Sequence, residues 1–214
     1  MPAPLLEVEH LRVEFPSRSG GLVALDDVSF AIAPGEILGV VGESGAGKSL
    51  TGAAIIGLLD PPGRIAGGEI RFDGARIDQL PYEEMRKLRG RQIGAIFQDP
   101  LTSLNPLYTV GRQLVETIRA HLPVSEAEAR KRAIGLLQDT GIPAAEQRID
   151  HFPHQFSGGM RQRVVIALAL AAEPKLIVAD EPTTALDVTI QAQIIQLLKQ
   201  VCKERGAAVM LITH

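Results

Sequence analysis

The sequence has little of several features that would mark special classes of protein. It holds one cysteine, no tryptophan and only 4% aromatic residues among its 214 residues. The lone Cys202 excludes an internal disulfide and a zinc site built on paired cysteines, which favours a reducing, cytosolic compartment. A net charge of −3 gives no basic excess for binding nucleic acid. The longest apolar run, residues 164–172, is far shorter than the roughly 20 residues of a membrane helix, so any membrane-spanning segment would belong to partners.

Short apolar segments predict two kinds of strand. Apolar residues alternate in parts of 5–15 and 68–74, as in half-buried strands, and Asp73-Gly74 is a hairpin turn signal. Four runs are continuously apolar, as in strands covered on both faces of a parallel sheet: 37–41, 93–97, 176–180 and 207–213. We therefore expect an α/β fold in which a parallel-sheet core carries an N-terminal antiparallel β layer.

Between the second and third of these runs, residues 100–173 have a helical pattern. Ser125 and Glu128 match a capping box, in which each side chain bonds the other residue's backbone N–H, and Gly141 marks a helix end. No linker or repeat indicates a second independent domain. We expect one domain over 1–214, with a core from 1–98 and 174–214 and an inserted helical subdomain at about 99–173.

A glycine-rich segment follows the first of the continuous apolar runs. Residues 42–49 read GESGAGKS and match the pattern G-x-x-x-x-G-K-[ST] between a strand and a helix-compatible run. Small residues let successive backbone N–H groups point into one concavity, and the helix adds its positive end, so the loop suits a polyphosphate. Lys48 would reach the β and γ phosphates, and the Ser49 hydroxyl would be a ligand of Mg²⁺. The alternative is a turn that only joins strand to helix. The predicted nucleotide-binding residues here are Gly42, Glu43, Ser44, Gly45, Ala46, Gly47, Lys48, Ser49 and Leu50.

Two acidic residues end another buried strand. In the segment LIVADEP, Asp180 closes the strand and Glu181 follows it. In a strand near the phosphate loop, Asp180 can hold the metal's water shell, while Glu181 faces the γ-phosphate and acts as base or water-positioning residue. A solvated, inert acidic pair is the alternative.

A second anion site is predicted where Ser157-Gly158-Gly159 begins an apolar helix. Free N–H groups and the helix dipole converge at such a start. One nucleotide does not need two such sites in one chain, so we expect a head-to-tail dimer in which each chain's SGG covers the γ-phosphate held by the other. The alternative is a Ser N-cap with a flexible glycine entry.

In this order, the motifs resemble those of the nucleotide-binding subunit of ABC transporters, over nearly the whole chain. FSGGMRQR at 156–163 is similar to the family signature, normally LSGGQ, with departures at Phe156 and Met160. FQDPLTSLNP at 97–106 is similar to the Q-loop segment of the peptide and nickel importer branch, which also commonly carries the FSGGM spelling. The resemblance implies a P-loop NTPase fold that binds ATP and Mg²⁺.

The resemblance also assigns roles to four individual residues. Gln98 would contact the metal and the water and sense the membrane partner, and Asp187, in TALD, would lie in the D-loop at the dimer interface. Phe15 matches the position where the family stacks an aromatic residue, usually Tyr, on adenine. His214 matches the switch histidine that contacts the γ-phosphate.

The function implied is that of an ATP-hydrolysing subunit of an importer for di- and oligopeptides or nickel. Its partners would be a second ATPase subunit, identical or paralogous, two transmembrane permease subunits and, indirectly, an extracytoplasmic solute-binding protein, with no nucleic acid. It would work as a peripheral protein on the cytoplasmic face of the inner membrane.

Two other functions are weighed against this one. A soluble ABC ATPase of DNA repair or the ribosome would carry basic patches, a long coiled coil or a tandem duplication, and the sequence has none of these. The second is a regulatory module that binds a nucleotide but no longer hydrolyses ATP. Such a module could lose Glu181, so the presence of this residue argues against it.

The remaining features have ordinary structural explanations. Pro153 argues against a helix that would align His151 and His154 on a metal. Cys202 lies in a predicted helix over 190–205 and is expected to be a passive side chain. The basic residues Arg86, Lys87, Arg89 and Arg91 are expected on a solvated helix face.

Chains of the resembled family continue past the switch histidine. We therefore expect this chain to be truncated at its C-terminus, with its last strand at an exposed sheet edge.

Overall fold

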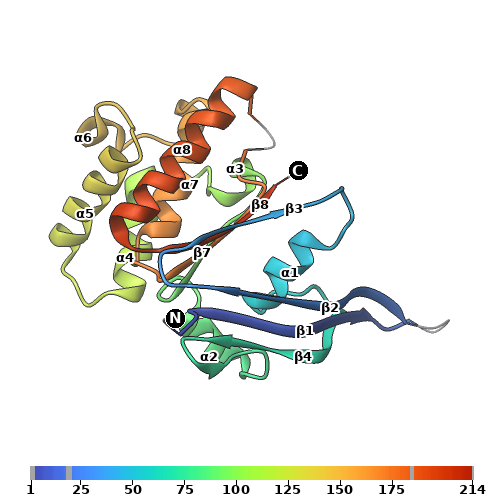
Figure 1. The fold of residues 1–214 in the computed structure, drawn as a ribbon. Coiled ribbons are helices and arrows are strands. Elements are labelled where there is room, and N and C mark those ends of the chain that lie inside the picture. The colour runs from blue at the N-terminus through green and yellow to red at the C-terminus, as the bar shows by residue number, and fades with distance from the viewer. Residues whose placement is uncertain (1–2, 18–20, 184–185, 214) are drawn as a thin grey trace.

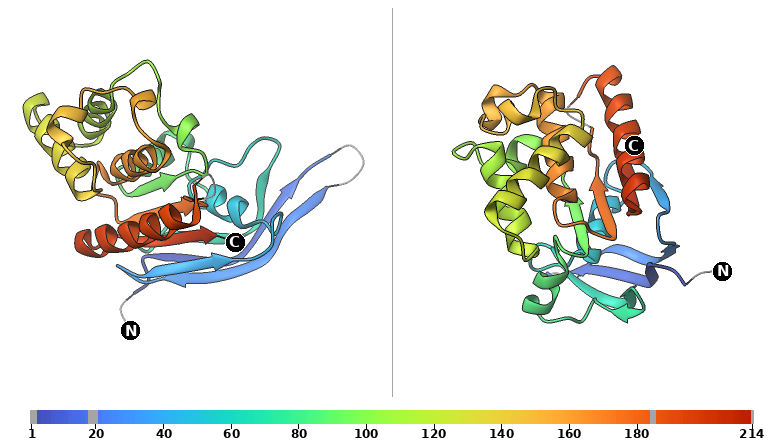
Figure 2. Two further views of the ribbon diagram at one scale, coloured as in Figure 1. Left: turned by 90° about the horizontal axis from the view of Figure 1, so that it is seen from above. Right: turned by 90° about the vertical axis from the view of Figure 1, so that its left-hand side faces the viewer.

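The computed structural model of the protein describes residues 3–17, 21–183 and 186–213 (Figure 1). Two four-stranded sheets stack with one helix between them, and further helices cover the outer face of the second sheet (Figures 1 and 2). The strands are β1 (Leu6–Phe15), β2 (Leu22–Ile32), β3 (Ile37–Val41), β4 (Arg64–Phe72), β5 (Ala75–Arg76), β6 (Ile93–Ile96), β7 (Leu176–Asp180) and β8 (Ala208–Thr213). The helices are α1 (Lys48–Ile55), α2 (Tyr82–Leu88), α3 (Pro100–Ser103), α4 (Val110–His121), α5 (Glu126–Asp139), α6 (Ala145–Arg148), the 3₁₀ turn η1 (Pro153–Gln155), α7 (Gly158–Leu170) and α8 (Val188–Arg205).

The antiparallel sheet has the order β2-β1-β4-β5. Along β1 the buried side chains switch from even positions, Leu6 and Val8, to odd positions, Leu11 and Val13. The switch coincides with register shifts against both neighbours and with a positive φ of 51° at His10. Because a one-residue bulge reverses which face the following side chains occupy, both halves of the strand face the same core.

The parallel sheet has the order β3-β8-β7-β6, and its central strands are covered on both faces. Val178 and Met210 belong to the core that contains α1 and the antiparallel sheet. Ile177 and Val209 belong to the core under the helices α4 to α8. Neighbouring residues of one strand thus face different cores, which explains the continuous apolar runs of β7 and β8. The prediction of an α/β fold with an antiparallel layer is confirmed.

One expectation about the parallel sheet holds in part and one is wrong. The run 37–41 forms β3, an edge strand within the described residues, and it packs against both cores through Ile37 on one face and Leu38 on the other, while Val41 is 68% exposed. The last strand, β8, was expected at an exposed edge, but it lies between β3 and β7 and is buried. Strand order follows from the crossover connections rather than from apolar content, so a strand late in the chain can pair inside the sheet.

Helices α3 to α7 lie between β6 and β7 in the sequence and gather at one side of the parallel sheet (Figure 2). The helix α5 begins at Ser125, whose hydroxyl accepts the Glu128 N–H, and Gly141 follows its end with a φ of 75°. Only this half of the capping box is seen, because the Glu128 carboxylate accepts a hydrogen bond from Arg132 instead. Within the described ranges, no helix combines the length and apolar character needed to cross a bilayer.

The four basic residues at 86–91 do not share one solvated face, which corrects the prediction. Arg86 and Lys87 are exposed and pair with Glu83 and Glu84 on α2. The Arg89 guanidinium instead donates to the Ile56 carbonyl (2.9 Å) and the Gly57 carbonyl (3.3 Å) at the end of α1. Arg91 donates to the Ala172 carbonyl (3.0 Å), just past the end of α7. Cations stabilise helix C-termini, so these two arginines cap separate helices.

Candidate functional site

The segment 42–47 forms a tight loop between β3 and α1. Gly45 and Gly47 have φ values of 82° and 83°, in the left-handed region that favours glycine. A Cβ at Gly47 would also overlap the Leu25 side chain and lie 3.3 Å from the Ala24 carbonyl oxygen. The loop therefore rests directly on β2, and no side chain fits at Gly47.

The Lys48 ammonium lies against this loop. Its Nζ donates to the carbonyl oxygens of Gly42 (2.7 Å) and Glu43 (2.8 Å), and the residue is only 8% exposed. A positive charge is thus fixed beside the first N–H groups of α1. Both features attract an anion.

Helix α1 packs closely on the parallel sheet because it carries Gly52. A Cβ at Gly52 would lie 3.1 Å from Val178 of β7 and 3.2 Å from Ile212 of β8. This close approach brings the start of α1 to the end of β7, where the Ser49 hydroxyl donates to the Asp180 carboxylate over 2.9 Å. Two residues 131 positions apart in the sequence thus share one hydrogen bond.

Glu181 follows at a strained backbone position. Its φ is 46°, its N–H donates to the Ile212 carbonyl (3.0 Å), and it is 9% exposed. The Gln98 amide, from the segment after β6, donates to Glu181 Oε2 over 3.0 Å. A non-glycine residue in the left-handed region is uncommon and typical of functional sites.

These groups surround one cavity of about 340 Å³. Its lining residues are Ser44, Gly45, Gly47, Lys48, Ser49, Leu50, Gln98 and Glu181. The cavity offers backbone N–H groups and an ammonium to a polyphosphate. The Ser49 and Asp180 oxygens suit Mg²⁺, which prefers hard oxygen ligands and takes others from water and phosphate. This fits a second finding: within the described ranges, no cluster of three or more His, Cys, Asp or Glu side chains could hold a metal by itself.

The Ser157-Gly158-Gly159 start of α7 does not line that cavity. The Ser157 hydroxyl accepts the Met160 N–H as an N-cap (3.4 Å). A Cβ at Gly158 would lie 3.5 Å from Leu186, just before α8, and one at Gly159 would lie 2.9 Å from Ile190 of α8. Asp187 caps α8 by accepting the Ile190 N–H (3.0 Å).

One further predicted residue, Phe15, does not line the cavity. Phe15 is partly buried at the end of β1, with its ring against Gly63. His214 lies outside the described residues, as do Thr184 and Ala185 of the predicted D-loop. The structure thus brings together Lys48, Ser49, Gln98, Asp180 and Glu181, and it leaves the SGG start and Phe15 outside this group.

Sequence reasoning missed residues that hold the site in place. The Gln191 amide donates to the carbonyl oxygens of Thr183 (3.1 Å) and Leu186 (3.0 Å), which secures the segment between β7 and α8. The sequence did offer a signal for Gln191, because this residue lies one helical turn after Asp187, the N-cap of α8. Gly52 and Leu25 carried no such signal, because their roles depend on contacts between distant elements.

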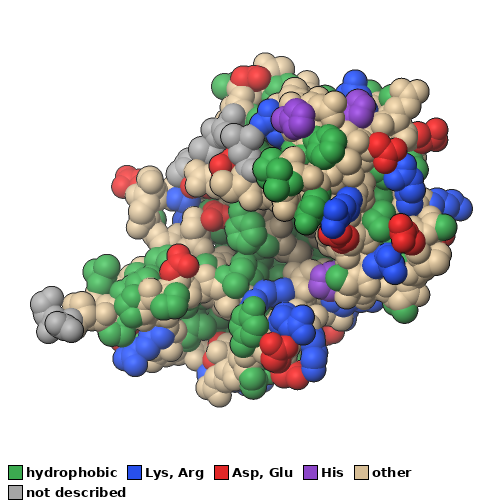
Figure 3. Space-filling view, turned by 180° about the vertical axis from the view of Figure 1, so that it is seen from behind, with side chains coloured by type: hydrophobic (Ala, Val, Ile, Leu, Met, Phe, Trp, Pro, Cys, Tyr) green, Lys and Arg blue, Asp and Glu red, His purple; other side chains and the backbone are tan. Residues whose placement is uncertain are grey.

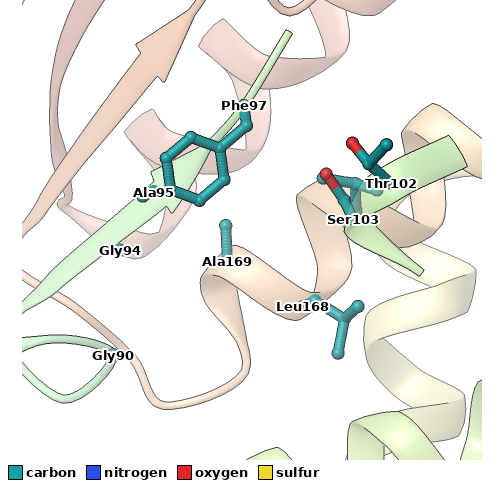
Figure 4. A pocket seen from close by; sticks show the side chains of 9 residues that line it. Gly90, Gly94, Ala95, Phe97, Thr102, Ser103, Leu168 and Ala169 are labelled. Atoms are coloured by element: carbon teal, nitrogen blue, oxygen red, sulfur yellow. The ribbon is translucent and has the colours of Figure 1, made fainter. Parts of the chain in front are cut away.

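A second, larger cavity of about 390 Å³ lies between β6 and the helical part. Figure 4 shows Phe97, Leu168 and the hydroxyl-bearing Thr102 and Ser103 around it. Phe97 is 49% exposed, and Leu107, which follows α3, is 79% exposed. Figure 3 shows hydrophobic side chains gathered where the helical part meets the two sheets.

The chain was compared with known proteins. Residues 25–184 match the family model described as ABC transporter. The oligopeptide transport ATP-binding protein of Bacillus subtilis is 53% identical over 211 residues, which cover 98% of this chain and 59% of that protein. The dipeptide transport ATP-binding protein of Escherichia coli is 50% identical over 210 residues, which cover 98% of this chain and 64% of that protein.

Among solved structures, a dimeric ATP-binding cassette in a post-hydrolysis state with ADP and Pi is similar, with a TM-score of 0.84 and 33% identity. The match covers 98% of this chain and 88% of that one. The chain spans about three fifths of the length of the two curated relatives. Because the family model covers well over half of the chain and both relatives align with nearly all of it, the chain belongs to the ABC transporter family.

Proposed function

We propose that the protein binds and hydrolyses ATP. The observation that carries this proposal is the Ser49–Asp180 hydrogen bond, which fixes the phosphate loop to the acidic strand end. Lys48 and Glu181 line the cavity beside that bond. A polyphosphate-binding loop, a pair of hard oxygen ligands and a shielded carboxylate are the parts that phosphoryl transfer to water requires.

The loop residues bind the phosphates. When the nucleotide binds, the Lys48 ammonium leaves the Gly42 and Glu43 carbonyl oxygens and donates to oxygens of the β and γ phosphates instead. The backbone N–H groups of the loop donate hydrogen bonds to the other phosphate oxygens. Ser49 and Asp180, with Gln98, would hold Mg²⁺, which supplies charge neutralisation on the phosphates when bound.

Glu181 orients and deprotonates the attacking water. Its carboxylate is 9% exposed and accepts a hydrogen bond from the Gln98 amide, which fixes its orientation toward the cavity. By the family resemblance, His214 contacts the γ-phosphate and Phe15 stacks on the adenine ring. Gln98 also links Glu181 to the segment before α3, where a membrane partner would be sensed.

The complete site forms in a head-to-tail dimer. Ser157, Gly158 and Gly159 do not line the cavity of their own chain, and in the dimer they would cover the γ-phosphate held by a second chain. Asp187 would lie at this dimer interface. The dimeric cassette with ADP and Pi supports this arrangement, because it shares the fold at 33% identity. Within each chain, residues 1–98 and 174–214 act as the core and about 99–173 as a helical subdomain.

The transported substrates are di- and oligopeptides. Two relatives at 50% identity or more are named for oligopeptide and dipeptide transport. Two permease subunits and, indirectly, an extracytoplasmic solute-binding protein complete the importer, with this chain on the cytoplasmic face of the membrane. The permease contact lies at the cavity of Figure 4, where Phe97 and the nearby Leu107 are exposed.

Hydrolysis is tested with Glu181→Gln. In the presence of ATP and Mg²⁺, the wild-type chain should release phosphate, and the variant should release it about 10²–10⁴-fold more slowly. The variant should remain dimeric in ATP by light scattering, because only the proton acceptor is lost. Equal phosphate release from both proteins would refute the role of Glu181.

Import is tested in cells that lack this gene. Uptake of labelled di- and tripeptides should fall and be restored by the wild-type gene, but not by the Glu181→Gln gene. Unchanged peptide uptake would refute the substrate assignment while leaving the ATPase proposal intact.

A further inference from the structure

The backbone conformation at Gly63 does not require a glycine. Its φ lies outside the positive range, so an alanine could adopt the same conformation. Space is what excludes a side chain. A Cβ at Gly63 would lie 2.7 Å from Cε1 and 2.9 Å from Cζ of Phe15, and 2.8 Å from the Asp60 carbonyl oxygen.

The register explains this contact. Val13 pairs with Ile65 and Glu14 with Arg64, so the next residues along the two strands, Phe15 and Gly63, come opposite each other at the end of the ladder. An aromatic ring that lies over a cross-strand glycine covers the bare backbone and gains packing area. The ring edge of Phe15 therefore fills the space that a side chain at position 63 would take.

The same register places Phe15 relative to the phosphate loop. Phe15 packs against the core to which Val13 belongs, so both side chains are on the same face of the sheet. The cross-strand partner of Val13 is Leu25, which contacts Gly47 of the loop. Two residues of strand span about 7 Å. Phe15 thus lies one step beyond the phosphate loop on the face toward it, at a distance suited to the base of a nucleotide.

We propose that Gly63 is a positioning residue for base recognition. It leaves room for the Phe15 ring to lie over the backbone of residue 63, which sets the place of the ring that stacks on adenine. The inference rests on the proposed function, since it assumes that Phe15 contacts the base. Any side chain at position 63 displaces the ring and weakens binding of the base, with no effect on binding of the phosphates.

The test compares two ligands, ATP and inorganic tripolyphosphate, by titration calorimetry with Mg²⁺. Loss of base stacking weakens binding by about 5- to 150-fold. Gly63→Ala should weaken ATP binding within this range and leave tripolyphosphate binding unchanged. Gly67→Ala, in the strand β4 that follows Gly63, is the matched control, because a Cβ there meets Arg12 at an ordinary 3.6 Å. It should change neither affinity.

A double-mutant cycle separates the ring contact from local damage at Asp60. Phe15→Ala removes the ring, so adding Gly63→Ala to that variant should cause no further loss of ATP affinity. A further loss equal to that of Gly63→Ala alone would overturn the inference, and so would an equal loss for tripolyphosphate. If Phe15→Ala weakens ATP binding but Gly63→Ala does not, the inference fails alone. If wild type binds ATP no better than tripolyphosphate and Phe15→Ala has no effect, the base contact itself fails, and the inference fails with it.

Discussion

Gly45 and Gly47 of the phosphate loop offer a matched pair for testing what fixes its shape. Both have positive φ, 82° at Gly45 and 83° at Gly47. Within the described chain, a Cβ at Gly45 would meet nothing within 4 Å, whereas a Cβ at Gly47 would overlap Leu25. Leu25 is 5% exposed and belongs to the core beneath the antiparallel sheet, so its side chain can move only by disturbing that core.

The expected loss of stability differs accordingly. An alanine in the left-handed region costs about 1–2 kcal/mol, and both variants incur this strain. Only Gly47→Ala adds overpacking, which costs about 1–3 kcal/mol more. The entropy change of the unfolded chain is the same, because each variant exchanges one glycine for one alanine. Gly47→Ala should therefore be less stable than Gly45→Ala by the overpacking cost.

Urea unfolding without nucleotide measures the difference. Both variants should keep the wild-type slope, with the lower midpoint for Gly47→Ala. In a Leu25→Ala background the overlap is gone, so adding Gly47→Ala should cost only the backbone strain. Equal midpoints for Gly45→Ala and Gly47→Ala would refute the reasoning, because the contact with Leu25 would then contribute nothing.

Three further predictions concern residues outside the loop. Arg91→Gln should destabilise the fold by about 1.5–3 kcal/mol by removing a charged donor from the Ala172 carbonyl. Arg86 is exposed, so the control Arg86→Gln should lower the free energy of unfolding by less than about 1 kcal/mol. Similar urea midpoints for the two variants would contradict the role of Arg91 in capping α7. Burial raises the pKa of the Cys202 thiol to about 12, so a thiol reagent at pH 8 should label it only after unfolding, and rapid labelling of the native chain would show that the thiol is accessible. The hydrogen bond that His10 donates to the Asp27 carboxylate, and then the charge of that carboxylate, raise the pKa of His10. The His10–Asp27 pair should stabilise the fold fully at pH values below the pKa of an unfolded histidine, and this stabilisation should be lost as the pH rises through the folded pKa of His10. Asp27→Asn should remove this pH dependence of the urea midpoint. A variant with the same pH profile as the wild type would contradict the prediction.

Local sequence patterns predicted the parts of the fold that depend on local chemistry. The hairpin signal Asp73-Gly74 lies at the turn between β4 and β5, with φ values of 50° and 77°. The continuous apolar runs became parallel strands in one sheet. Their order could not be predicted, because an apolar run such as 37–41 has the same composition at an edge as in the centre. The position of β3 at the edge depends on crossovers that no local pattern encodes.

The candidate site shows the same division. The spacing of the phosphate loop and the acidic strand end selected Lys48, Ser49 and Glu181, which line one cavity, and the family resemblance added Gln98 to the same cavity. The contacts that hold those residues are between distant segments, such as Gly52 against Val178. Glycine illustrates the limit well, because the sequence does not distinguish a glycine needed for its φ, as at Gly45, from one needed for space, as at Gly63.

The capping contacts of Arg89 and Arg91 have a consequence for communication within the chain. Each holds the C-terminal end of a helix whose N-terminal end carries one of the two predicted anion sites, α1 for the phosphate loop and α7 for the SGG start. A helix transmits displacement along its axis because its backbone hydrogen bonds run in that direction. A shift of either helix toward a bound anion would therefore stretch a hydrogen bond to the same three-residue segment, 89–91. In the proposed dimer those two N-termini face different nucleotides, so the hydrogen bonds of Arg89 and Arg91 would connect the two nucleotide sites through the segment 89–91.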